Sequence, residues 1–133
     1  MNIALLAHDG KKELMIQFCI AYCGILSEHA ITATGIAGRL VAEATGLPVS
    51  ICLPCSQGGT QQIGARIAYD EIDLVLFFSD PLGPEGSGEP LYISNLCDRY
   101  NIPYASNVAT AEVLIKGLQR GDFAWRDIVN PKK

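Results

Sequence analysis

The stretch DLVLFF, residues 73–78, decides the fold class of this chain of 133 residues. After Asp73 the apolar residues are consecutive, and no polar residue alternates with them. A strand buried by helices on both faces of a parallel sheet has this composition, whereas a strand with one face in water alternates. The stretch therefore predicts a central strand of a parallel sheet.

Shorter apolar runs recur along the chain and alternate with segments of helical spacing. The predicted strands are residues 2–7, 30–34, 49–53, 73–78 and 103–106. The predicted helices are residues 11–28, 36–44, 59–70, 89–100 and 109–118, and an aromatic turn covers residues 123–128. This alternation is typical of an α/β doubly wound fold. We expect a single domain over residues 1–133, with a parallel sheet of about five strands.

Composition and charge exclude several classes of function. The formal net charge is −4 and the 10 Lys and Arg residues are scattered, which argues against a nucleic-acid surface. No apolar run has the length of a membrane span, and the start of the chain lacks the features of a signal peptide. An odd number of cysteines, 5, indicates reduced thiols. We expect a cytoplasmic protein that binds neither nucleic acid nor membrane.

Polar and small residues follow each predicted strand, at the edge where doubly wound sheets bind ligands. These residues are His8, Asp9, Thr34, Gly35, Gly38, Cys55, Ser56, Gly58, Gly59, Ser79, Asp80, Asn107 and Thr110. Gly58, Gly59 and Thr60 open a helix, whose first N–H groups and dipole favour an anion. Lys12 adds a cation near His8. The set predicts a site for a small phosphorylated or carboxylated molecule.

Short motifs run in a fixed order along nearly the whole chain. They are A-H-D with a following lysine (residues 7–12), A-T-G-x-x-G (33–38), E-A-T-G-L (43–47) and G-G-x-Q-Q-I-G-A (58–65). They continue with D-L-V-x-F (73–77), D-P-L (80–82), N-I-P (101–103) and N-V-A-T-A (107–111). In this order the motifs resemble those of the methylglyoxal synthase family.

The resemblance implies a compact α/β subunit that assembles as a homohexamer. It also implies a carbon–oxygen lyase that converts dihydroxyacetone phosphate to methylglyoxal and phosphate, without cofactor or metal. In the family the base is the Asp of G-G-D-Q-Q, and histidines of A-H-D and of the loop after D-P-L handle the oxygens. The phosphate lies on T-G-T-T-G and S-G-P. Carried over to this chain, the catalytic candidates are His8, Asp80, Asp9 and Thr60, and the phosphate-binding candidates are Lys12, Thr34, Gly35, Ile36, Ala37, Cys55, Gly58 and Gly59.

The chain departs from the family at the reacting positions. Thr60 stands in place of the base, and a threonine hydroxyl does not take a proton near neutral pH without strong activation. Ile36 and Ala37 replace two hydroxyl side chains, PCS (54–56) replaces S-G-P, and the loop after Asp80 contains no histidine. If the one-residue gap in this loop is placed early, Glu89 stands where the family has an acidic residue. The family reaction then requires Asp80 or Asp9 as the base, with His8 as the proton shuttle.

Other interpretations remain open at this point. One is a divergent relative that acts on another small anionic carbonyl compound, and another is a non-catalytic sensor of small anions. The spacing of Cys19, Cys23, Cys52 and Cys55 leaves a metal site open, and Cys52 with Cys55 leaves a redox pair open. Cys55 beside a helix N-terminus is either a nucleophile, a ligand contact or a small residue filling the place of a glycine.

Overall fold

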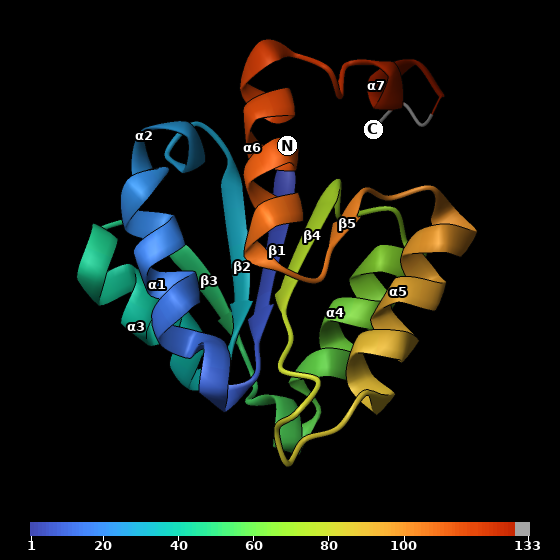
Figure 1. The fold of residues 1–133 in the computed structure, drawn as a ribbon. Coiled ribbons are helices and arrows are strands. Elements are labelled where there is room, and N and C mark those ends of the chain that lie inside the picture. Colours follow the sequence, from blue (N-terminus) through green and yellow to red (C-terminus); the bar gives the residue numbers. More distant parts are fainter. Residues whose placement is uncertain (130–133) are drawn as a thin grey trace.

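The computed structural model describes residues 1–129 and contains a five-stranded sheet of order β3-β2-β1-β4-β5 (Figure 1). The strands are β1 (Asn2–Ala7), β2 (Ala30–Thr34), β3 (Val49–Cys52), β4 (Leu74–Phe78) and β5 (Tyr104–Ala105). Every pair of neighbouring strands is parallel, so the predicted doubly wound parallel sheet is confirmed. The end of the expected domain, residues 130–133, lies outside the described residues.

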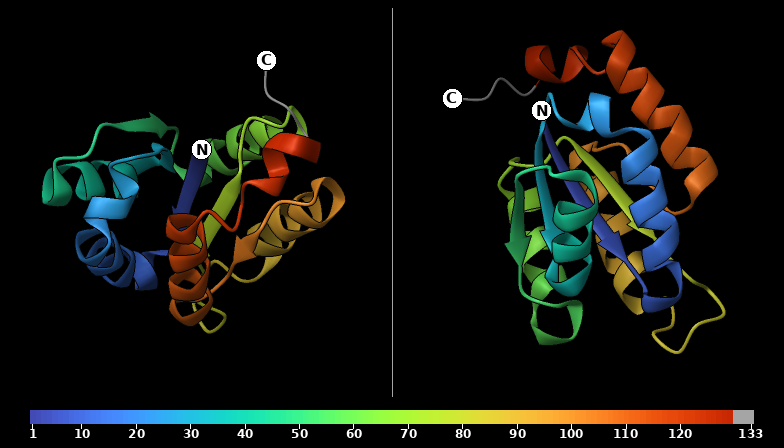
Figure 2. Two further views of the ribbon diagram at one scale, coloured as in Figure 1. Left: turned by 90° about the horizontal axis from the view of Figure 1, so that it is seen from above. Right: turned by 90° about the vertical axis from the view of Figure 1, so that its left-hand side faces the viewer.

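Helices connect the strands and cover both faces of the sheet. They are α1 (Lys12–Ala21), α2 (Cys23–Leu26), α3 (Gly35–Thr45), α4 (Gly59–Ala68), α5 (Gly88–Tyr100), α6 (Val108–Arg120) and α7 (Trp125–Val129), with 3-10 turns η1 (Asp9–Lys11) and η2 (Cys55–Gln57). Figures 1 and 2 show α1, α3 and α6 against one face of the sheet and α4 and α5 against the other. Within residues 1–129, none of the helices combines the length and the apolar character that a bilayer span requires.

The predicted elements begin and end close to the observed ones, with one exception. The single helix predicted for residues 11–28 is divided into α1 and α2. The division falls at Tyr22, where φ of −109° and ψ of 22° leave the helical region. The Tyr22 ring packs near the Phe18 ring, with ring centroids 4.9 Å apart.

The apolar composition of residues 73–78 follows from burial on both faces of β4. All residues of β4 are buried. Leu74, Leu76 and Phe78 belong to the core layer under α1, α3 and α6. Val75 and Phe77 belong to the layer under α4 and α5. Since successive side chains of a strand point to opposite faces, one strand supplies both layers, and each fully buried side chain contributes about 1.5–3 kcal/mol.

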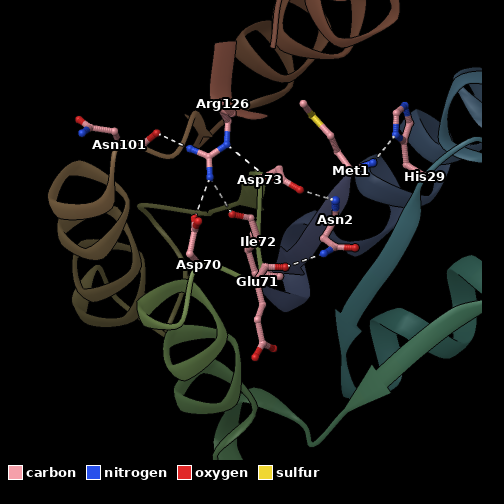
Figure 3. A network of polar contacts seen from close by, with 9 residues as sticks. All are labelled: Met1, Asn2, His29, Asp70, Glu71, Ile72, Asp73, Asn101 and Arg126. Carbon is pink, nitrogen blue, oxygen red and sulfur yellow. Dashed lines mark hydrogen bonds and ion pairs between the residues drawn. The ribbon is translucent and has the colours of Figure 1, made fainter. Parts of the chain in front are cut away.

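Different segments of the chain lie at the two ends of the sheet. At the carboxyl ends of the strands, at the bottom of Figure 1, η2 and the loop between β4 and α5 meet. At the opposite end, α7 inserts Arg126 among the turns, and this side chain is only 1% exposed. Figure 3 shows its guanidinium between Asp70, Asp73 and the carbonyl oxygen of Asn101, at 3.1, 3.3 and 2.7 Å. The ligand-binding edge predicted from the strand ends is therefore separate from this ionic network.

Candidate active site

A cavity of about 270 Å³ opens at the carboxyl ends of the strands. Its walls come from the end of β1, the junction of β2 with α3, the turn η2, and the segment that leads into α5. The lining residues are Ala7, His8, Asp9, Lys12, Thr34, Gly35, Ile36, Ala37, Pro54, Cys55, Ser56, Glu85 and Glu89. Most of the site residues predicted from the sequence are therefore brought together by the fold.

His8 and Thr34 are the buried polar residues of this lining, and His8 is 5% exposed. The backbone N–H of Asp80 donates a hydrogen bond to His8 Nδ1 at 2.9 Å. Because this bond uses the lone pair of Nδ1, the proton of the neutral ring lies on Nε2. Nε2 is buried and has no hydrogen-bond partner within residues 1–129. Buried polar atoms are normally satisfied, so this N–H is suited to donate to an oxygen of a bound ligand.

The start of α3 and the turn η2 form one wall of the cavity, which suits an anion and is called the anion wall below. Helix α3 begins at Gly35 directly after β2, and no side chain caps its first N–H groups. Such a helix start attracts negative charge through its unpaired N–H groups and its dipole. Pro54 passes so close that a Cβ on Gly35 would lie 2.6 Å from its Cα, and Gly35 also has φ of +41°. A glycine is needed here because the close approach leaves no room for a side chain.

The side chains around this wall contact one another through hydrogen bonds and an ion pair. The thiol of Cys55 donates to Thr34 Oγ1 at 3.4 Å. Lys12 Nζ lies 3.1 Å from Asp9 Oδ1, and the side chains are 26% and 84% exposed. The backbone N–H of Asp9 donates to Glu85 Oε2 at 2.7 Å. Among the lining residues, Lys12 is the one that carries a positively charged side chain of the lysine or arginine type, and this side chain is 26% exposed.

Thr60 and Glu89 form a pair that links the two helices on the other face of the sheet. Thr60 is 0% exposed, and its hydroxyl donates a hydrogen bond to Glu89 Oε2. Glu89 lies in the first turn of α5 and lines the cavity, whereas Thr60 does not. Of the three carboxylates in the lining, those of Asp9, Glu85 and Glu89, the one from α5 is therefore hydrogen-bonded to the residue at the family's base position.

Three other predicted residues are also absent from the lining. Asp80 meets the backbone instead: its Oδ1 accepts from the N–H of Leu82 at 3.2 Å, and its Oδ2 lies close against Gly10. Gly58 has φ of +101°, and a Cβ on Gly59 would overlap the carbonyl oxygen of Leu53. These glycines shape the turn between η2 and α4, so the anion wall is formed by α3 and η2 rather than by the start of α4.

Glu85 lines the cavity, although the sequence did not place it among the candidates, whereas Ser56 in η2 was expected at this edge. Glu85 lies in the loop between β4 and α5, where no periodic pattern fixes the direction of a side chain. The sequence signal for Glu85 was weak, because the loop that carries it differs in length from the family pattern. Glu89, in the first turn of α5, was the carboxylate that the motif comparison pointed to after this loop.

The cysteines do not form a metal site in the part of the chain that the structure describes. Among residues 1–129, no group of three or more His, Cys, Asp or Glu side chains is arranged to hold a metal ion. All five cysteines are free thiols. Burial raises the pKa of Cys19 and Cys97 to about 12, and burial also raises the pKa of Cys52. Of the five, Cys55 lines the cavity.

Comparisons with known proteins agree on one family. No protein-family model matches the chain. A methylglyoxal synthase of Caldicellulosiruptor saccharolyticus is 59% identical over 133 residues, which cover 99% of this chain and 94% of that protein. A methylglyoxal synthase of a Geobacillus species is 51% identical, covering 100% and 96%. The crystal structure of methylglyoxal synthase from Elizabethkingia anophelis has a TM-score of 0.80 at 38% identity, covering 86% of this chain and 76% of that one. With identity this high over nearly its full length, the chain belongs to the methylglyoxal synthase family.

Proposed function

We propose that this protein is a carbon–oxygen lyase that converts dihydroxyacetone phosphate into methylglyoxal and inorganic phosphate. The observation that carries the proposal is the buried Nε2–H of His8, which lacks a partner within residues 1–129 and belongs to the same lining as the start of α3. The His8 N–H can donate to the oxyanion that develops at the carbonyl of this substrate, and the start of α3 can bind its phosphate. Family membership at 59% identity supports the same reaction.

Phosphate binding is assigned to the anion wall. The first N–H groups of α3 do not depend on side chains, so the loss of hydroxyls at Ile36 and Ala37 leaves them in place. Lys12, 26% exposed, adds a positive charge at the cavity. The Thr34 hydroxyl already accepts from the Cys55 thiol and keeps its own proton for a phosphate oxygen. The wall therefore supplies mostly backbone donors.

The chemistry requires a base, an oxyanion donor and a held leaving group. The base removes a proton from the hydroxymethyl carbon, and the C–H electron pair becomes the C=C bond of an enediolate. The oxyanion of this enediolate accepts a hydrogen bond from His8 Nε2. The C–O bond to phosphate then breaks, the phosphate leaves with the electron pair, and the remaining enol takes a proton on carbon to become methylglyoxal. None of these steps calls for a redox cofactor.

Turnover of dihydroxyacetone phosphate tests the proposal, with methylglyoxal and phosphate measured together. We expect both products in equal amounts, and a loss of roughly 100-fold in kcat for His8→Leu because one oxyanion donor is removed. Phosphate alone is expected to raise the melting temperature. Stabilisation by phosphate without any turnover would instead indicate a sensor of small anions, and the absence of both effects would refute the anion wall as well as the reaction.

We also propose that the subunit assembles as a homohexamer in the cytoplasm. Exposed apolar side chains support self-association: Ile51 and Leu53, on and just after the edge strand β3, are 44% and 47% exposed, and Ile36 on α3 is 60% exposed. The free thiols support a reducing compartment. Light scattering after size exclusion tests the assembly, and Ile51→Lys is expected to weaken it. A monomer of 14.3 kDa in the wild type would contradict the proposal.

A further inference from the structure

Position 60 holds a side chain that cannot act as the base in its observed state. Thr60 is 0% exposed and donates its only hydroxyl proton to Glu89 Oε2. A hydroxyl engaged in this way is a donor, and it would have to lose that proton before it took another one. The contact joins residues 29 positions apart in the sequence, in the first turns of α4 and α5. The question is then which group receives the proton of the substrate.

Glu89 has the free acceptor that Thr60 lacks. Its Oε2 is held by Thr60, while its Oε1 makes no hydrogen bond or ion pair within residues 1–129. The side chain is half-buried and lines the cavity together with His8. Glu89 lies in the first turn of α5, and a carboxylate is a group that can accept a proton. Glu89 thus combines support on one oxygen with availability on the other.

The other carboxylates near the cavity are less suited to this role. Asp9 is 84% exposed and is ion-paired with Lys12 at 3.1 Å. Glu85 is exposed and its Oε2 accepts from the N–H of Asp9. Asp80 does not line the cavity, and its carboxylate is turned toward the backbone of Leu82. A general base has to be held in place, and among these groups only Glu89 is held by a fully buried neighbour.

We propose that Glu89 is the general base of the reaction and that Thr60 is the residue that positions it. The inference rests on the proposed function. In the first step the proton of the hydroxymethyl carbon passes to Glu89, and the C–H electron pair becomes part of the enediolate that His8 stabilises. The base has thus moved from α4 to α5, while the cavity keeps a carboxylate. Thr60 acts through Glu89 and does not touch the substrate.

Steady-state kinetics with dihydroxyacetone phosphate test the roles. Glu89→Gln is nearly isosteric, keeps an oxygen that can accept from Thr60, and removes the base, so we expect kcat to fall by about 10²–10⁴-fold. The melting-temperature shift caused by inorganic phosphate should persist, which shows that the variant is folded and still binds the anion. Glu43→Gln, on an exposed part of α3 outside the lining, is the matched control and should keep the wild-type kcat.

Thr60 is tested by two substitutions. Thr60→Val removes the hydroxyl at similar volume, and we expect kcat to fall roughly tenfold while KM stays within about twofold, because the substrate contacts remain. Thr60→Ser restores the donor and should recover kcat. If Thr60 had a structural role alone, Thr60→Val would lower stability but would not lower kcat at an unchanged KM. Thr60→Ser would then not restore kcat.

The outcomes separate the inference from the function on which it rests. If the wild-type protein does not turn over dihydroxyacetone phosphate, the proposed function fails. If the wild type is active and a folded Glu89→Gln variant keeps kcat within about threefold, the function stands and Glu89 is not the base. A collapse of kcat in Glu85→Gln with normal turnover in Glu89→Gln would move the role to Glu85 and overturn the proposal. Thr60→Val with unchanged kcat would remove Thr60 from the mechanism.

Discussion

Replacing Arg126 by methionine is expected to destabilise the protein far more than replacing a surface arginine. The guanidinium is 1% exposed and contacts Asp73, itself 2% exposed, at 3.3 Å (Figure 3). It also donates to the carbonyl oxygen of Asn101 at 2.7 Å. Its second ion pair, with Asp70 at 3.1 Å, involves a side chain that is 35% exposed. The substitution leaves buried polar groups behind, and this loss dominates the effect.

The magnitude follows from the burial of each partner. Removing one partner of a buried ion pair destabilises by about 3–5 kcal/mol, and the partly exposed Asp70 adds at most about 1 kcal/mol. Asp73 keeps one hydrogen bond, because its Oδ2 accepts from the N–H of Asn2 at 2.8 Å, so the lower part of the range applies. We expect a loss of about 3–4 kcal/mol in the free energy of unfolding and a fall of roughly 10 °C in the melting temperature.

Urea unfolding followed by far-ultraviolet circular dichroism, at one protein concentration, measures this loss. The control is Arg120→Met, because Arg120 pairs with Asp122 at 2.8 Å but the side chains are 64% and 53% exposed. It should change the free energy of unfolding by less than about 1 kcal/mol. If Arg126→Met loses no more than Arg120→Met, burial does not decide the strength of these pairs and the reasoning is refuted. Turnover per folded molecule should be unchanged, because Arg126 lies at the opposite end of the sheet from the cavity.

Two further predictions concern stability. Gly59→Ala is expected to destabilise the protein by about 3 kcal/mol or more in urea unfolding, since the added Cβ would overlap the carbonyl oxygen of Leu53. In the control Gly24→Ala the added Cβ meets nothing within 4 Å, so the substitution should be neutral or stabilise by up to about 1 kcal/mol. Because the pKa of Cys19 and Cys97 rises from 9.0 to about 12 on folding, the unfolded chain loses these protons first, and stability falls as pH rises from 9 toward 12. At pH 10 each thiol accounts for about 1.4 kcal/mol, so Cys97→Ala should show a smaller drop between pH 8 and pH 10 than the wild type, and an equal drop would contradict the assignment.

The strands were predictable because burial leaves a local pattern in the sequence. β4 is buried along its whole length and reads as a continuous apolar run. The interruption at Tyr22 was not predictable, since helical spacing of apolar residues continues through it. The strand order was equally hidden, because pairing β1 with β4 joins segments that are separated by about half of the chain.

In the candidate site too, some residues could be placed from the sequence and others could not. Residues that directly follow strands β1 and β2, such as His8 and Gly35, were predicted and lie in the cavity, because the strand end itself fixes their place. Asp80 also follows a strand, yet only its backbone N–H reaches His8, while its carboxylate caps the next turn. A strand end thus places a residue at the right edge but leaves the direction of its side chain to the loop that follows.

Thr60 illustrates the most consequential limit of reading positions one at a time. In the sequence it is a base that has been lost, because a motif compares residue types at a single position. In the structure it is one half of a contact with Glu89, and the cavity receives a carboxylate after all. In the proposed mechanism the proton passes to a carboxylate that lines the cavity, and the contact between Thr60 and Glu89 joins the first turns of α4 and α5. The substitution at position 60 is therefore explained only together with the residue that it touches.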